Sequence, residues 1–277
     1  MADAPDLTAS WDPKGEAMRL WGADPCGGAI AAHHEGSAEF FAEVDRLRYD
    51  QYAPWLRQAA EFGAHQGERV LEIGCGMGTD LAQFVRGGAI TFGLDLTTRH
   101  LGIARARLEL EGVSPRLVRA DAECLPIRSG SLDVVYSFGV LHHTPGIEAA
   151  IQEIHRVLRP GGTFLLGLYH RDSAFYWLNT LLVWGILHGR LFRDGYRRLM
   201  GDIERHDHTD ALPLVNVYSR RQVRHLLSRF SAADVTAHHF EAGHLSYLEP
   251  AVRGVSRATL ERIGRRWGWY VIARATR

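Results

Sequence analysis

The sequence predicts an α/β protein, a three-layer α/β/α sandwich around a mostly parallel seven-stranded sheet. Three observations support this fold class. Short apolar segments alternate with amphipathic helical segments from residue 69 to residue 168. A glycine-rich turn directly follows the first apolar segment. The chain has 277 residues, of which 46% are hydrophobic and 23% charged, so it is long enough to bury a large core.

The N-terminal part is expected to pack on this body as a helical arm. Residues 1–36 are rich in Gly, Pro and Trp and lack periodicity. In residues 37–62 the apolar side chains recur at helical spacing, and Pro54 fits the first turn of a second, short helix. The spacing is carried by Phe40, Phe41, Val44, Leu47 and Leu56.

Strands and helices then alternate along the chain. Each expected strand is a short apolar run bounded by turn residues, as is typical of buried parallel strands. Thr97 or Thr98 caps the start of one helix, Gly112 follows its end, and a Pro-Gly-Gly turn ends another. The expected strands are residues 69–73, 89–94, 116–119, 132–137 and 163–168, and the expected helices are 80–86, 97–111 and 147–158.

The alternation stops after the fifth strand. Residues 170–218 hold apolar helical stretches and polar loops, which predicts a helical cap inserted at this point. Ser219 is the expected N-cap of a helix at 219–230, and strands at 233–239 and 269–275 complete the sheet. The predicted organisation is an arm with helices at 1–62, a core at 63–169, the cap at 170–218 and a completing segment at 219–277.

Composition favours a cytoplasmic protein that does not bind nucleic acid. Cys26, Cys75 and Cys124 are odd in number and form no CxxC pair, so neither a disulfide framework nor a zinc site is predicted. No signal peptide and no uninterrupted run of 18 apolar residues is apparent, so stable membrane insertion is not expected. The formal net charge is zero, and no basic strip with interleaved aromatic residues is present.

The glycine-rich turn is a candidate cofactor site. Gly74, Gly76 and Gly78 follow a strand and precede a helix, so the backbone can turn sharply and approach a ligand closely. A nicotinamide dinucleotide fingerprint, G-x-G-x-x-G, would place glycine where this chain has Thr79. Asp95 ends the second strand, where a carboxylate can accept hydrogen bonds from a ribose diol. A carboxylate at this position suits a nicotinamide dinucleotide and also other cofactors that contain a ribose, so Asp95 alone does not distinguish between them.

Five segments, in order and spacing, resemble class I S-adenosylmethionine (SAM)-dependent methyltransferases, which have a Rossmann-like fold. The nearest branch is that of the ubiquinone and menaquinone C-methyltransferases, which also includes enzymes for many other small molecules. The segments are 72–78 (EIGCGMG), 93–97 (GLDLT), 121–126 (DAECLP), 133–145 (DVVYSFGVLHHTP) and 158–164 (LRPGGTF). The resemblance implies SAM as the cofactor and S-adenosylhomocysteine as the product.

The resemblance also implies roles around the methionine part and the sulfonium. The backbones of Gly74, Cys75 and Gly76 would line the methionine part, and Glu72 would order the loop from behind. Ser137 and Phe138 would lie beside the sulfonium. All of these residues lie at the ends of the expected first and fourth strands or on the turn after the first.

For the nucleoside, the implied contacts come from the second strand and the segment after the third. Asp95 would accept from both ribose hydroxyls, and Leu96 would pack on the adenine. Asp121 would accept from the adenine amine, and the N–H of Ala122 would donate to the ring.

Three residues are predicted to serve catalysis. His143 and His170 follow the fourth and fifth strands at the edge where ligands bind in such sheets. Tyr49 lies on the N-terminal helix, which in this family often folds over SAM. A general base is needed only if the acceptor must lose a proton, and a loop-shaping role for His143 stays open.

The expected partner is a small-molecule acceptor, partly apolar or anionic because the cap holds both aromatic side chains and arginines. His206 and His208 have metal-binding residue types, but no third converging ligand is identifiable, so no metal is predicted. A monomer or a homodimer is expected. Two alternatives stay open: a SAM-dependent enzyme that transfers a group other than methyl, and a SAM-binding regulatory subunit without turnover.

Overall fold

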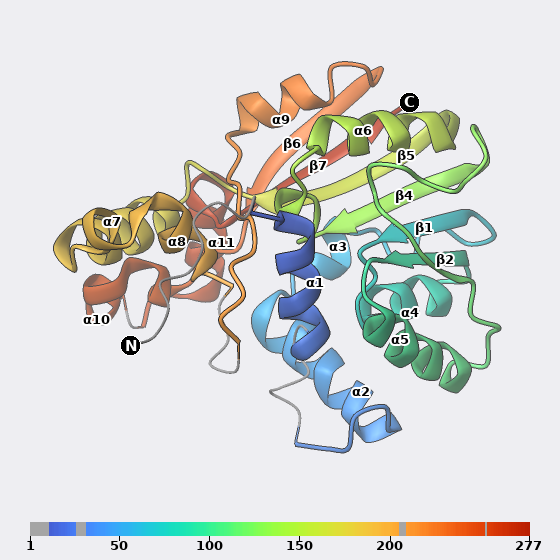
Figure 1. The fold of residues 1–277 in the computed structure, drawn as a ribbon, viewed down its shortest axis with the longest axis horizontal. Helices are drawn as coiled ribbons and strands as arrows, with labels where there is room; N and C mark the ends of the chain where they lie inside the picture. The colour runs from blue at the N-terminus through green and yellow to red at the C-terminus, as the bar shows by residue number, and fades with distance from the viewer. Residues whose placement is uncertain (1–10, 26–31, 205–208, 253) are drawn as a thin grey trace.

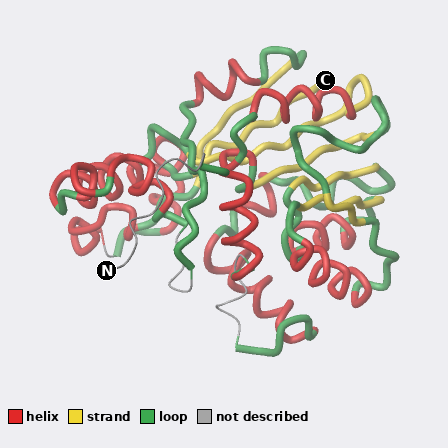
Figure 2. The backbone as a smooth tube through the Cα atoms, in the orientation of Figure 1, coloured by secondary structure: helices red, strands yellow, loops and turns green. Residues whose placement is uncertain are grey.

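The computed structural model describes residues 11–25, 32–204, 209–252 and 254–277. Its centre is a seven-stranded sheet in the order β3-β2-β1-β4-β5-β7-β6, drawn in yellow in Figure 2. β7 pairs antiparallel with β5 and β6, and the other neighbouring strands are parallel. The strands are β1 (Arg69–Ile73), β2 (Ile90–Asp95), β3 (Leu117–Arg119), β4 (Leu132–Phe138), β5 (Leu158–Tyr169), β6 (Ala232–His238) and β7 (Tyr270–Thr276).

Helices cover both faces of this sheet. Figure 1 shows α6 and α9 on one side and α4 and α5 on the other. Before the cap, the described helices are α1 (Pro13–Ala23), α2 (Ala38–Arg46), the π-helix η1 (Leu47–Tyr52), α3 (Leu56–Ala59), α4 (Thr79–Arg86), α5 (Thr98–Leu110), the 3-10 helix η2 (Leu141–His143) and α6 (Ile147–Val157). From the cap onward they are η3 (Phe175–Leu187), α7 (Arg190–Arg193), α8 (Gly195–Gly201), α9 (Arg220–Leu226), η4 (Ala242–Leu248), α10 (Glu249–Val252) and α11 (Arg257–Trp267).

The two-residue period of the strands builds the two cores. Leu71 of β1 and Val135 of β4 belong to a buried cluster with residues of α6 and α9. Their neighbours Val70 and Val134 point to the opposite face, in a cluster with residues of α3 and α4. Both faces of the central strands are therefore buried, as their apolar sequences predict. The predicted Rossmann-like three-layer sandwich is confirmed.

The segment before residue 36 is more regular than expected. We expected an aperiodic arm, but residues 13–23 form helix α1. The side chain of Asp12 accepts from the backbone N–H of Lys14, and Pro13 occupies the first turn, where its missing N–H costs no hydrogen bond. The helix buries Ala17 and Leu20. A cap residue followed by proline was the local signal for this helix.

The predicted cap after β5 is present and has an additional part. Figure 1 places α7, α8 and α10 together at one end of the molecule, and η3 packs against η4. This second part comes from the chain between β6 and β7, where no helix was predicted. Among the described residues, no helix is long and apolar enough to cross a membrane. Several large apolar side chains of the cap are exposed, namely Trp177, Leu182, Trp184, Ile186, Leu187 and Phe192.

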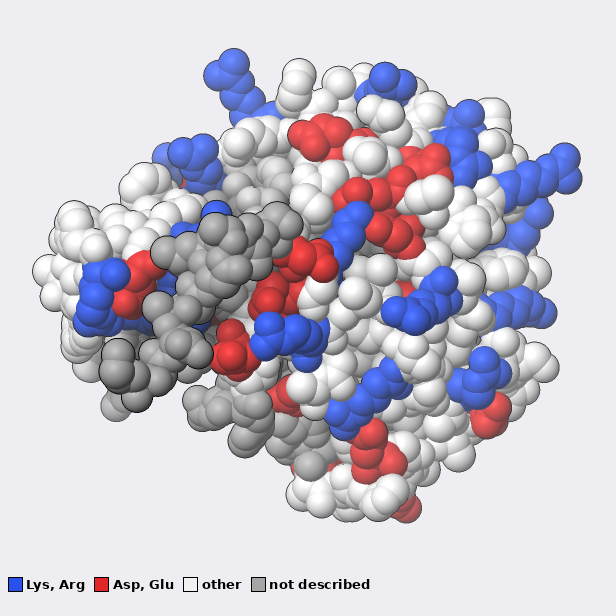
Figure 3. Space-filling view, viewed as in Figure 1, with Lys and Arg blue, Asp and Glu red and all other residues white. Residues whose placement is uncertain are grey.

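Acidic and basic side chains are interspersed on the face drawn in Figure 3, as expected for a chain with a formal net charge of zero. Many of them form ion pairs, such as Arg99 with Glu35 at 2.8 Å. Exposed pairs of this kind contribute about 0–1 kcal/mol each to folding.

Candidate functional site

The glycine-rich loop lies where the strand order reverses. β1 and β4 are neighbours, but the chain continues from β1 outward to β2 and from β4 outward to β5. In open α/β sheets, ligands bind at the carboxyl ends of the strands at such a point. Gly74, Gly76 and Gly78 follow β1 there with φ of 72°, 50° and 74°. Residues other than glycine rarely adopt this left-handed conformation.

The glycines of this loop have different surroundings. A Cβ atom at Gly74 would lie 2.3 Å from the side chain of Val140, so Gly74 is needed for packing. A Cβ at Gly76 would meet no atom within 4 Å. The loop therefore leaves room for a ligand beside the backbone of Gly76. The carboxylate of Glu72 is also buried here, and its Oε2 has no hydrogen-bond partner within the described part of the chain.

Asp95 ties the end of β2 to this loop. Its Oδ2 accepts from the backbone N–H of Gly76 at 2.9 Å, and its Oδ1 accepts from the N–H and hydroxyl of Thr97 at 2.8 and 2.7 Å. Burial alone would raise the pKa of this carboxyl, but His100 and Thr97 hold the pKa below its usual range. Asp95 is therefore ionised at neutral pH, at the position predicted to bind a ribose.

The predicted adenine acceptor, Asp121, contacts helix α1. The ammonium of Lys14 lies 2.6 Å from Asp121 Oδ2 and 2.7 Å from Glu123 Oε2. Although burial opposes the charge, the hydrogen bonds that the ammonium donates to these two carboxylates raise the pKa of Lys14. A ligand amine that donates to Asp121 must share this carboxylate with Lys14. Neither Lys14 nor Glu123 was identified from the sequence, because nothing local links residue 14 to residue 121.

Tyr49 belongs to a buried network around Asp80, a residue predicted only to begin the helix at 80–86. Arg48 Nε and Nη2 donate to the Asp80 carboxylate at 2.7 and 2.5 Å. The hydroxyls of Tyr49 and Tyr136 donate to the same carboxylate. Burial opposes the charge on Asp80, but Arg48 and these hydroxyls lower its pKa. The network joins the N-terminal helices to the loop, and the catalytic role of Tyr49 stays a prediction.

The remaining predicted cofactor residues lie at the carboxyl ends of β1, β2, β3 and β4 or on the segments that follow them. Cys75 is buried, and burial together with Asp95 raises the pKa of its thiol. Ser137 is fully buried and donates to the carbonyl of Ile73 at 3.1 Å. The Phe138 ring packs on Tyr270 with centroids 4.7 Å apart.

Of the two other residues predicted to contact the nucleoside, Leu96 is partly exposed and Ala122 is buried. Leu96 is half-buried, and its carbonyl accepts from Arg119 Nε at 2.9 Å. Ala122 is 8% exposed. The cofactor-binding roles of these residues, like that of Asp95, stay predictions.

A cluster of polar and aromatic side chains lies beyond β4 and β5. His142 and His143 form part of η2, and the rings of His142 and Tyr169 are in contact, with centroids 3.8 Å apart and planes tilted by 33°. The hydroxyl of Tyr169 donates to Glu204 in the cap, and Trp21 of α1 packs 4.6 Å from the ring of His143. Burial lowers the pKa of both histidines, with the neighbouring His143 adding to the effect at His142.

His170 lies elsewhere on this edge. Its Nδ1 is 2.9 Å from the carbonyl oxygen of Gly268, and burial lowers its pKa. Its Nε2 is 3.8 Å from the carboxylate of Asp172. His170 thus faces the β7 side, whereas His143 faces α1 and the cap. Cys26, His206 and His208 lie outside the described residues.

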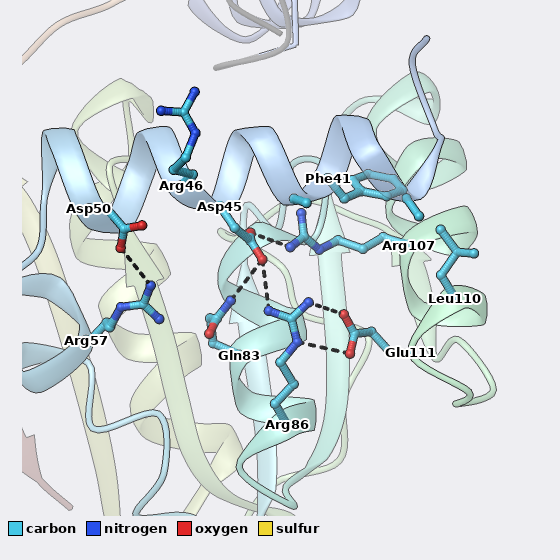
Figure 4. Close-up of a pocket in the computed structure, with 12 residues that line it drawn as sticks. Phe41, Asp45, Arg46, Asp50, Arg57, Gln83, Arg86, Arg107, Leu110 and Glu111 are labelled. Atoms are coloured by element: carbon cyan, nitrogen blue, oxygen red, sulfur yellow. Dashed lines mark hydrogen bonds and ion pairs between the residues drawn. The ribbon is translucent and has the colours of Figure 1, made fainter. Parts of the chain in front are cut away.

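A groove of about 460 Å³ on another part of the surface is lined by α2, α4 and α5 (Figure 4). None of the predicted cofactor or catalytic residues lines it. Several of its charged groups pair with one another: Asp45 pairs with Arg86 at 2.8 Å and with Arg107, and Arg86 also pairs with Glu111. We assign this groove no part in the site.

The fold is that of an α/β protein with a glycine-rich loop at the reversal of a Rossmann-like sheet. Residues 71–166 match the model of a family described as a methyltransferase domain. Sterol 24-C-methyltransferase from Gibberella zeae is 36% identical over 44% of this chain and 31% of that protein. Ubiquinone biosynthesis O-methyltransferase from Ralstonia nicotianae is 31% identical over 50% of this chain and 56% of that protein.

A solved SAM-dependent methyltransferase from Thermotoga maritima shares the fold. Its TM-score is 0.55 at 19% sequence identity, over 85% of this chain and 94% of that chain. The chain spans about a third to about half of the length of the two curated relatives. The match of residues 71–166 to a methyltransferase domain spans the same part of the chain as the five motifs and agrees with the resemblance that they indicate.

Proposed function

We propose that this protein is an enzyme that transfers a methyl group from SAM to a small-molecule acceptor. The observation that carries the proposal is the loop after β1, where Gly76 leaves open space beside an ionised Asp95. This arrangement fits an adenosyl ligand, because the carboxylate can accept from a ribose diol while the loop backbone admits the amino-acid part.

The residues of this protein would contribute to the reaction by aligning the methyl donor with the acceptor. SAM supplies a methyl group already activated on a positively charged sulfur. Asp95 and Asp121 would hold the nucleoside, the loop backbone at Gly76 would hold the amino-acid part, and Phe138 would border the reacting centre. Such positioning, together with exclusion of water, supplies most of the catalysis of an in-line displacement. His143 and His170 are the candidate catalytic residues on the acceptor side.

The acceptor is proposed to be partly apolar. The His142–Tyr169 cluster combines aromatic faces with a few polar atoms, a combination typical of small-molecule sites. The relatives named for sterol and ubiquinone methylation are consistent with this chemistry. An anionic acceptor, a monomer or homodimer, a cytoplasmic location and the absence of nucleic-acid binding stay predictions.

The reaction is tested with SAM that carries a radioactive methyl group and a panel of phenols, hydroquinones and sterols. We expect label in one acceptor class, with one S-adenosylhomocysteine formed for each methyl transferred. Binding of SAM without any turnover would favour the regulatory alternative, and an adenosyl product other than S-adenosylhomocysteine would favour transfer of another group.

Gly76→Ala is expected to keep the fold and to weaken SAM binding by more than about tenfold. An alanine with φ near 50° costs roughly 1–2 kcal/mol, and its Cβ fills the open space beside the loop. Gly112→Ala is the matched control, because Gly112 also has positive φ and open surroundings but follows the far end of α5. Calorimetry with equal SAM affinity for the two variants would remove Gly76 from the cofactor site.

A further inference from the structure

His142 has an unusual environment for a polar side chain. It is fully buried, and neither of its ring nitrogens has a hydrogen-bond partner among the residues that the structure describes. A buried polar group without a hydrogen-bond partner destabilises the folded protein, because it has given up its hydrogen bonds to water. Its ring contacts the rings of Tyr169 and His143, with centroids 3.8 and 4.0 Å away, and both of its nitrogens stay available to a ligand.

Two further potential ligands converge on the same place. One ring nitrogen each of His142 and His143 and a carboxylate oxygen of Glu204 all lie within 4.8 Å of one another. An ion that binds its ligands tetrahedrally at about 2.0–2.2 Å holds the ligand atoms about 3.3–3.6 Å apart, so side-chain shifts of no more than about 1.5 Å would close the site. Two imidazoles and one carboxylate form a donor set that suits divalent transition metals.

The surrounding hydrogen bonds orient these groups. His143 Nδ1 lies 2.7 Å from the carbonyl oxygen of Leu214, and because a carbonyl only accepts, Nδ1 carries the proton and Nε2 keeps its lone pair. The hydroxyl of Tyr169 donates to Oε1 of Glu204. Outer partners of this kind, a carbonyl for the histidine and a donor for the carboxylate, are characteristic of metal sites.

We propose that His142, His143 and Glu204 bind one divalent transition-metal ion of the Zn²⁺ type. With three protein ligands, the ion keeps a position open for water or for an oxygen of a small molecule. Metal binding itself does not depend on the proposed methyl transfer. If both hold, His143 is a ligand rather than a base, and the ion positions an acceptor oxygen; this role rests on the proposed function.

The test is binding of metal alone to the full chain after EDTA treatment and dialysis. We expect one equivalent of Zn²⁺ by calorimetry, and d–d absorption bands of a low-symmetry Co²⁺ site on titration with Co²⁺. Glu204→Gln keeps the shape and the acceptor for Tyr169 but removes the charge. This variant should weaken Zn²⁺ binding by more than the roughly 10–100-fold typical of losing an outer partner. His142→Asn should do the same.

A second histidine–carboxylate cluster provides the matched control. His239, Glu241 and His244 also bring ligand atoms within 4.8 Å, but these atoms belong to another part of the fold. His244→Asn should leave Zn²⁺ affinity unchanged. The proposal is overturned if the wild type binds no stoichiometric metal, or if Glu204→Gln and His142→Asn, folded by circular dichroism, bind Zn²⁺ like the wild type. SAM binding by the metal-free protein, measured separately, distinguishes this failure from failure of the proposed function.

Discussion

Replacing Asp95 by Ala is expected to weaken SAM binding at least about a hundredfold, or about 3 kcal/mol. The two ribose hydroxyls would each lose a hydrogen bond to an ionised acceptor, and such bonds contribute about 1.5–3 kcal/mol each. The variant also loses the contacts to Gly76 and Thr97, so the loop becomes less ordered. Calorimetry on wild-type and variant protein measures the difference.

Asp133→Ala is the control for a general loss of stability. Asp133 lies near the opposite end of β4 and pairs with Arg159 and Arg69, so its loss should lower the melting temperature without changing SAM affinity. Equal SAM affinity of Asp95→Ala and the wild type would show that Asp95 only supports the loop.

Asp80→Ala is expected to lower the free energy of unfolding by about 3–5 kcal/mol. The change leaves the Arg48 guanidinium and the hydroxyls of Tyr49 and Tyr136 without their shared acceptor in a buried site. Breaking a buried pair costs more than the pair itself contributes, because the remaining charge stays desolvated. Urea unfolding followed by circular dichroism measures the loss.

A double variant separates the charge effect from simple loss of packing. Arg48→Met combined with Asp80→Leu removes both charges and keeps apolar volume, so it should be more stable than Asp80→Ala alone. A loss below about 1 kcal/mol for Asp80→Ala, typical of exposed pairs, would contradict the role of this network.

The sheet could be predicted because the apolar pattern of each strand indicates, from local sequence alone, that the strand is buried. The predicted first strand agrees with β1 at both ends, since an apolar run next to a glycine turn depends only on local sequence. β5 begins at Leu158, five residues before its predicted start. The Pro-Gly-Gly turn signal was overridden by pairing: Gly161 N–H donates to the Arg277 carbonyl, and Arg277 N–H donates to that of Gly162.

The candidate site was predictable only where its residues lie within motifs. Asp95 and Gly76 were found from their motifs, and the structure links them by a hydrogen bond. Lys14 and Glu204 could not be found, because their contacts join segments far apart in sequence and depend on how α1 and the cap pack. Tertiary packing of this kind leaves no periodic signal in the chain.

The most direct test of the account is calorimetric titration of the purified protein with S-adenosylhomocysteine and, in parallel, with NADH. The account predicts one binding site for S-adenosylhomocysteine with a dissociation constant in the micromolar range, and no binding of NADH. Tight binding of NADH, or the absence of S-adenosylhomocysteine binding by folded protein, would contradict it.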